Sequence, residues 1–130
     1  MQVELPSYVF PPVTPVVSSP TTQRRSWEEA IARAEALRNL ETDWNGQGSE
    51  APNPADVDVC IRLLTAVRSE GRLPPPVFIS AASDGAVCVE WHRDEVRLEA
   101  EITTECVEWM LADGKRPAKF FETPLPTSDP

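Results

Sequence analysis

The chain has 130 residues and a formal net charge of −9, which fits one domain with a modest core and flanking tails. A negative surface opposes phosphate backbones and anionic lipids, so we expect no direct contact with nucleic acid or with a membrane. The sequence has no run of about 18 apolar residues that would span a bilayer, and no basic-then-apolar N-terminal signal. We therefore expect a cytoplasmic protein.

Residues 1–25 contain five of the fourteen prolines and show no helical period. Such a composition is typical of an extended leader. Within it, Tyr8-Val9-Phe10 is a short β-prone patch that is suited to docking on a sheet edge or on another protein. Tyr8 and Phe10 are therefore candidate partner-binding residues, and a disordered leader is the alternative.

A first helix is predicted over residues 27–41. Ser26 and Glu29 have the spacing of a capping box, in which each side chain satisfies a free backbone N–H group at the start of a helix. Apolar residues recur at helical spacing along one face. They are Trp27, Ile31, Ala34 and Leu37, followed by Leu40 or Trp44.

A tight corner follows this helix, because Asn45-Gly46 and Gly48 readily adopt positive φ. A second helix begins after Asn53, a good N-cap residue, with Pro54 in its first turn. Gly71 is a stop signal, so this helix should end near Arg68 or Ser69. Its apolar stripe consists of Val57, Cys60, Ile61, Leu64 and Val67.

After Pro74-Pro75-Pro76 the hydrophobic period changes from helical to alternating, which predicts strands. Four strands are expected near residues 77–79, 87–91, 96–102 and 107–111, in an antiparallel meander with one apolar face. Phe120-Phe121 either packs back on the domain or forms a last short strand. The pattern therefore predicts an α+β domain over residues 26–121 and a flexible tail over residues 122–130.

In this fold the two helices pack on the apolar face of the four-stranded meander. All four tryptophans are expected in or against one core, with Trp44 anchoring the corner. They are Trp27, Trp44, Trp91 and Trp109.

The corner Trp44-Asn45-Gly46-Gln47-Gly48-Ser49, the hairpin Asp84-Gly85 and the strand pair Glu90-Trp91 occur in this order. In this respect residues 27–111 resemble a broad group of small, uncharacterised bacterial proteins with a Trp-Asp-Gly-x-Gly-Ala-like corner between two helices and a C-terminal strand meander. Asn45 and Ser49 depart from that pattern but keep its turn chemistry. The resemblance implies this fold and a bacterial or phage origin, and it implies no activity.

The polar face of the predicted sheet is acidic. If residues 92–95 form a four-residue turn, Glu90 lies opposite Arg97, a favourable pair. If residues 103–106 form the next turn, Glu101 lies directly opposite Glu108, and like charges in that position are destabilising. The glutamates on this face are Glu90, Glu99, Glu101 and Glu108.

Because only Arg97 offsets these four carboxylates, a basic protein surface is a fitting partner. A divalent cation is a rarer alternative. The third interpretation is a solvated face that only keeps the sheet soluble and blocks edge aggregation.

Catalytic motifs are absent from the sequence. His92, the single histidine, falls in a predicted turn, and no nucleophile, phosphate-binding or Cys-x-x-C motif has its required context. The three cysteines are expected to be free, buried or half-buried thiols. We expect no catalytic residue, no cofactor and no metal ligand.

The sequence therefore favours a non-enzymatic, acidic protein-binding module, for example an antitoxin-like, immunity-like or inhibitory subunit. The alternative is a structural or accessory subunit of a larger complex that docks through its Pro-rich leader. A carboxylate metal-site enzyme is the third hypothesis.

Overall fold

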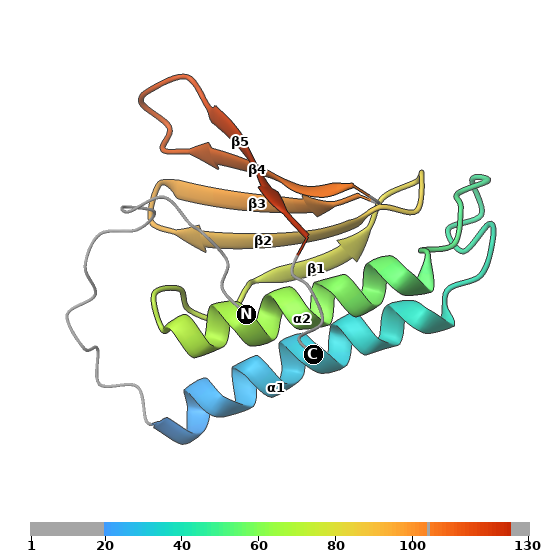
Figure 1. Ribbon diagram of the computed structural model, residues 1–130, viewed down its shortest axis with the longest axis horizontal. Coiled ribbons are helices and arrows are strands. Elements are labelled where there is room, and N and C mark those ends of the chain that lie inside the picture. Colours follow the sequence, from blue (N-terminus) through green and yellow to red (C-terminus); the bar gives the residue numbers. More distant parts are fainter. Residues whose placement is uncertain (1–19, 104, 126–130) are drawn as a thin grey trace.

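Two helices and an antiparallel sheet form two layers in the computed structural model, which describes residues 20–103 and 105–125 (Figure 1). The α+β class is confirmed, but the sheet has five strands where four were expected. Tyr8 and Phe10 lie outside the described residues. The elements are α1 (Pro20–Ala36), the 3-10 turn η1 (Leu37–Asn39), α2 (Pro54–Glu70), β1 (Phe78–Ala81), β2 (Val87–Arg93), β3 (Val96–Ile102), β4 (Cys106–Ala112) and β5 (Lys119–Pro124).

The first helix is longer at its N-terminus than the sequence pattern predicts. It begins at Pro20, a residue that fits the first turn of a helix, and Ser26 lies inside it. The predicted start at Ser26 is therefore wrong, because the residues before the capping pattern continue the helix. The buried stripe along α1 and η1 is confirmed at Trp27, Ala34 and Leu37.

The second helix has the predicted caps. The Asn53 side chain accepts a hydrogen bond of 2.9 Å from the backbone N–H of Ala55. Gly71 ends the helix with φ +72°, and its N–H donates to the carbonyl of Val67. The buried face of α2 is wider than one stripe, because α2 packs against both α1 and the sheet (Figure 1). Of the predicted stripe only Ile61 is half-buried rather than buried, and the further apolar residues buried on α2 are Val59, Leu63 and Ala66.

The corner between the helices is organised by Asp43, which sequence reasoning missed. Asp43 adopts φ +66°, its Oδ1 accepts from the N–H of Gly48, and its own N–H donates to the carbonyl of Ser49. Trp44 is only half-buried and lies outside the core, so its predicted core position is wrong. Its Nε1 donates to the carbonyl of Glu50 at 2.9 Å, which fixes the corner through a hydrogen bond.

The same corner packs against the β1–β2 hairpin. The N–H of Glu50 donates to the carbonyl of Ser83 at 2.9 Å. A Cβ atom at Gly85, where φ is +86°, would lie 2.9 Å from the carbonyl oxygen of Ala51. This close approach between two backbone segments requires glycine at position 85.

The core joins both helices to the inner face of the sheet, and the other three tryptophans are buried in it as predicted. Trp109 stacks between Trp91 and Phe121, with ring centroids 6.0 and 5.8 Å apart. The Nε1 of Trp109 donates to Thr123 Oγ1 at 2.9 Å. The stack and this hydrogen bond attach β5 to the rest of the sheet.

Replacing Trp91 with alanine should lower the free energy of unfolding by about 3–5 kcal/mol, because the side chain is fully buried. Replacing Trp44 should cost only about 1–2 kcal/mol, since half burial and one hydrogen bond are lost. Denaturant unfolding of the two variants measures both values. Equal losses would contradict the position of Trp44 outside the core.

A second prediction concerns Gly85, with Gly114 as the matched control. Gly114 has a similar φ of +79°, but an added Cβ there meets no atom closer than 3.9 Å. Alanine at either position incurs the strain of positive φ. Gly85→Ala should cost about 1–3 kcal/mol more than Gly114→Ala, because only Gly85 is packed against another segment. Equal losses in thermal or denaturant unfolding would show that the corner does not contact the hairpin.

Candidate functional site

The outer face of the sheet, opposite the helices, carries five glutamates. We call this surface the acidic face, and its residues are Glu90, Glu99, Glu101, Glu108 and Glu122. The first four were predicted to share this face, and the structure confirms it. Glu122 was missed because it falls within the predicted flexible tail, whereas β5 extends to Pro124 and so brings it into the sheet.

The predicted register of the β3–β4 hairpin is confirmed. Glu101 lies directly opposite Glu108, as Ile102 lies opposite Val107. Glu108 in turn lies opposite Glu122 on β5. Three carboxylates therefore form a continuous row across three strands, an arrangement that is destabilising without a compensating positive charge.

The predicted register of the β2–β3 hairpin is wrong. The turn contains two residues, Asp94 and Glu95, instead of four, so that Arg93 lies opposite Val96. Asp94 adopts φ +54°, a conformation that aspartate tolerates better than most residues and that short hairpin turns need. Glu90 consequently lies opposite Glu99, where Arg97 was expected.

His92 and Arg97 lie at one end of this face. His92 is an exposed residue of β2, not of a turn, and its Nε2 lies 2.9 Å from Glu90 Oε2. Arg97 Nε lies 4.0 Å from Glu99 Oε2. In the part of the chain that the structure describes, the row of Glu101, Glu108 and Glu122 makes no ion pair.

The crowding of carboxylates affects their protonation. Partial burial raises the pKa of Glu101 above its ordinary value, and the charges of Asp84 and Glu108 raise it further. The pKa of Glu99 is also raised, by burial first and then by Glu90 opposite it. The face therefore holds negative charge at neutral pH against an electrostatic cost.

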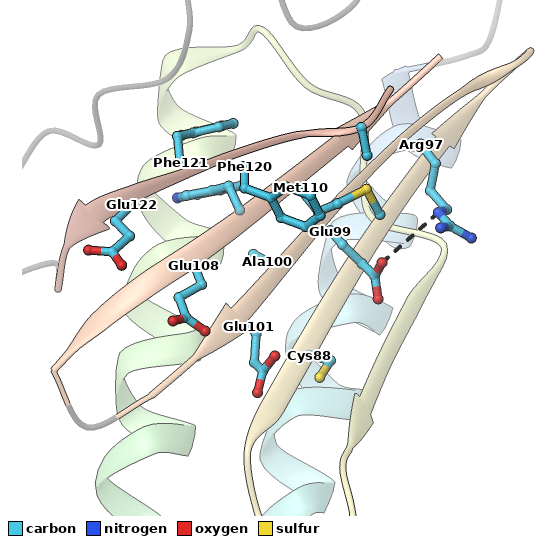
Figure 2. A pocket seen from close by; sticks show the side chains of 12 residues that line it. Cys88, Arg97, Glu99, Ala100, Glu101, Glu108, Met110, Phe120, Phe121 and Glu122 are labelled. Carbon is cyan, nitrogen blue, oxygen red and sulfur yellow. Dashed lines mark ion pairs between the residues drawn. The ribbon is translucent and has the colours of Figure 1, made fainter. Parts of the chain in front are cut away.

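A hollow of about 660 Å³ lies over β3, β4 and β5 on this face (Figure 2). Met110 and Phe120 form its apolar wall, and they lie directly opposite each other in the β4–β5 register. The Phe120 side chain is 77% exposed. Four glutamates also line the hollow, and Arg97 is a cationic residue among the remaining lining residues. The glutamates are Glu99, Glu101, Glu108 and Glu122.

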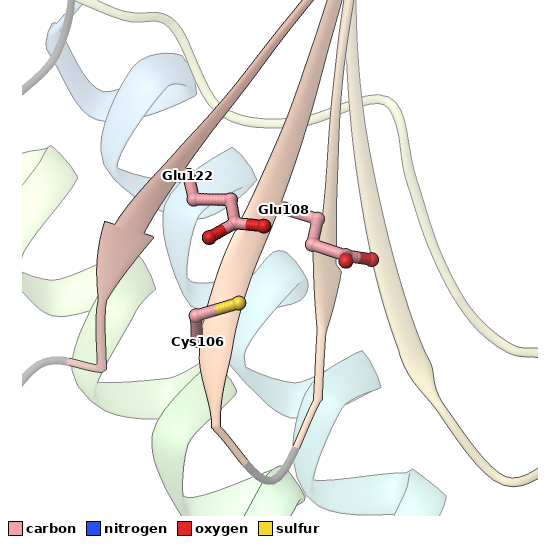
Figure 3. A group of neighbouring side chains, drawn as sticks. All are labelled: Cys106, Glu108 and Glu122. Atoms are coloured by element: carbon pink, nitrogen blue, oxygen red, sulfur yellow. The ribbon is translucent and has the colours of Figure 1, made fainter.

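One set of side chains has metal-ligand spacing. The thiol of Cys106 and the carboxylates of Glu108 and Glu122 lie within 4.8 Å of one another (Figure 3). Among the described residues no other group of three or more such side chains converges in this way. Both glutamates are exposed, and exposed acidic groups are common without a bound ion. The cluster is a geometric possibility to which no function is assigned.

The cysteines are free, as predicted, and two of them are poor nucleophiles. Burial raises the pKa of Cys60 to about 12. Burial, followed by the charge of Glu101, raises the pKa of Cys88 to about 11. A thiol needs a lowered pKa to react as a thiolate at neutral pH, so neither residue is suited to covalent catalysis.

Comparison of the chain with models of protein families, with the sequences of characterised proteins and with solved structures returned no match. The resemblance to small bacterial proteins with a glycine-rich corner therefore stays a prediction. Within the described residues, neither helix has both the length and the apolar character to cross a bilayer.

The raised pKa of Glu101 makes stability depend on pH. Because the pKa in the folded state exceeds that in the unfolded state, ionisation of Glu101 destabilises the fold at neutral pH, and this penalty is lost as the pH falls through the raised pKa. Glu101→Gln should therefore raise the free energy of unfolding by about 0.2–1 kcal/mol at neutral pH and change it little near about pH 4. Denaturant unfolding at both pH values measures the difference.

Glu28→Gln is the matched control, because Glu28 is exposed on α1 and the net charge changes equally. This variant should leave stability almost unchanged at both pH values. If Glu101→Gln destabilised the protein at neutral pH, its carboxylate would be held by a positive group.

Proposed function

We propose that this protein is a non-enzymatic binding module whose acidic face receives the basic surface of another protein. The observation that carries the proposal is the unscreened row of Glu101, Glu108 and Glu122 on the uncovered face of the sheet. Complementary charge on a partner would relieve their repulsion and steer its approach. An antitoxin-like, immunity-like or inhibitory subunit in a bacterial or phage cytoplasm fits this behaviour.

The energetic cost of the face supports a role beyond solubility. A solvated sheet face needs charge, but it can mix both signs and so avoid like-charge pairs. Here Glu90 lies opposite Glu99, and Glu101 lies opposite Glu108. Repulsion at such positions lowers the stability of the free protein and is removed when a cationic partner binds.

The leader remains the alternative binding element, and truncation separates the two hypotheses. Docking through Tyr8 or Phe10 requires the leader, whereas docking on the acidic face does not. Because α1 begins at Pro20, deletion of residues 1–19 removes the leader without cutting the helix. Loss of partner binding in this deletion variant would favour the accessory-subunit hypothesis.

The carboxylate metal-site enzyme also stays a prediction. It requires metal-dependent activity that disappears in Glu101→Gln or Glu108→Gln.

The proposal predicts salt-sensitive binding that depends on Glu101 and Glu108. A partner captured from the native host should associate with the double variant Glu101→Lys, Glu108→Lys at least about tenfold more slowly than with the wild type at low salt, and dissociate at a similar rate. Surface biosensor kinetics over a range of salt concentrations measure both rate constants. Raising the salt concentration should slow association with the wild-type protein.

The matched control reverses two charges on the other layer, at Glu28 and Glu29, which are exposed on α1. Glu28→Lys, Glu29→Lys changes the net charge equally and should retain most of the wild-type association rate. Binding that is insensitive to salt, or that both double variants weaken equally, would exclude the acidic face as the binding site.

A further inference from the structure

The hollow on the acidic face combines an apolar wall with carboxylates in a regular grid. The grid is formed by outward residues of β3, β4 and β5 that lie two positions apart along each strand. One row across the strands is Glu99, Met110 and Phe120, and the next row is Glu101, Glu108 and Glu122. Residues two apart on a strand are separated by roughly 7 Å. An extended side chain can thus contact one row with its aliphatic part and the other row with its charged end.

Phe120 contributes an exposed aromatic ring to this hollow. Its ring lies on the edge strand β5 and is the most exposed of the large hydrophobic side chains described. Figure 2 shows Phe120 beside Met110, with Glu108 and Glu122 on the adjoining part of the sheet. A cation that used only the carboxylates would leave this aromatic surface in water.

The carboxylates of this face without an ion-pair partner among the described residues lie next to this apolar wall. Arg97 lies near Glu99 and offsets part of its charge. The neighbouring row of Glu101, Glu108 and Glu122 has no such partner among the residues that the structure describes. The hollow lies on the face of the sheet that the helices leave uncovered, where a side chain projecting from a macromolecule can reach it.

From this juxtaposition we infer that the hollow receives an arginine side chain of the basic partner, with its guanidinium between the Phe120 ring and the row of Glu101, Glu108 and Glu122. The inference rests on the proposed function and identifies the residue type that the partner presents. A guanidinium is planar, stacks on aromatic rings and donates two parallel hydrogen bonds to a carboxylate. A lysine ammonium is a compact and strongly hydrated charge, so it matches the carboxylates but not the ring.

The test compares two synthetic peptides of equal charge, octa-arginine and octa-lysine, bound to the full chain. Fluorescence anisotropy at low salt, with EDTA present to exclude metal bridging, gives both dissociation constants. The wild-type protein should bind octa-arginine about fivefold to tenfold more tightly than octa-lysine. Phe120→Ala should reduce this ratio to within about twofold while octa-lysine affinity stays similar. Circular dichroism verifies that the variant is folded. We expect it to fold because Phe120 is 77% exposed.

Phe78→Ala is the matched control. Phe78 is also exposed, at 57%, and lies at the opposite edge of the same face on β1. Its ring is already in edge contact with His92, with centroids 5.9 Å apart. The preference for arginine should therefore persist in this variant.

Three outcomes separate this inference from the proposed function. If both peptides bind equally well, and Glu101→Gln, Glu108→Gln weakens both, the arginine inference is overturned and the acidic face stands as a general cation-binding surface. Persistence of the arginine preference in Phe120→Ala would overturn the inference in the same way. If neither peptide binds, or if Glu101→Gln, Glu108→Gln leaves the affinity for both peptides unchanged, the proposed function is wrong and the inference is wrong with it.

Discussion

Side chains of a β-strand alternate between the two faces of its sheet, and the helices of this protein cover only one face (Figure 1). Each residue of β2 to β5 thereby lies either on the covered face, which carries the core, or on the outer face. Trp91 and Trp109 lie on the covered side, while Glu90 and Glu108 lie on the other. A slip of one residue would bury carboxylates and expose tryptophans, so the core and the acidic face depend on one register.

The fold tolerates the acidic face because repulsion between glutamates costs less free energy than tryptophan burial contributes. Each directly opposed pair of glutamates costs up to about 1 kcal/mol, whereas one buried tryptophan contributes about 3–5 kcal/mol. The stack of Trp91, Trp109 and Phe121 therefore holds the sheet in a register that its outer charges disfavour. The fold can sustain this strain in the free state, and a basic partner would release it.

Local signals in the sequence were enough to predict the α2 caps, the acidic character of the outer face and the β3–β4 register. The β2–β3 register was not predictable in the same way, because the turn depends on positive φ at Asp94 and no glycine or asparagine marks it. A last short strand at Phe120-Phe121 was one of two alternatives, and β5 confirms it, but the prolines that follow gave no sign that the strand extends to Pro124. Pro124 is compatible with the end of an edge strand, where its missing N–H is not needed, so proline content alone misplaced Glu122 in a tail.

Strand β5 connects the core to the exposed ring of the arginine site that we infer. A face of glutamates alone would attract any cation, and discrimination requires a contact that one ligand makes and another does not. In the arginine site that we infer, Phe120 would supply such a contact on β5, and Phe121, the next residue, faces the opposite way and stacks on Trp109. The Trp109–Thr123 hydrogen bond holds the same strand. The exposed ring is thus positioned by buried neighbours, so changes in the core beneath β5 would alter the choice of ligand before they altered the charge of the face.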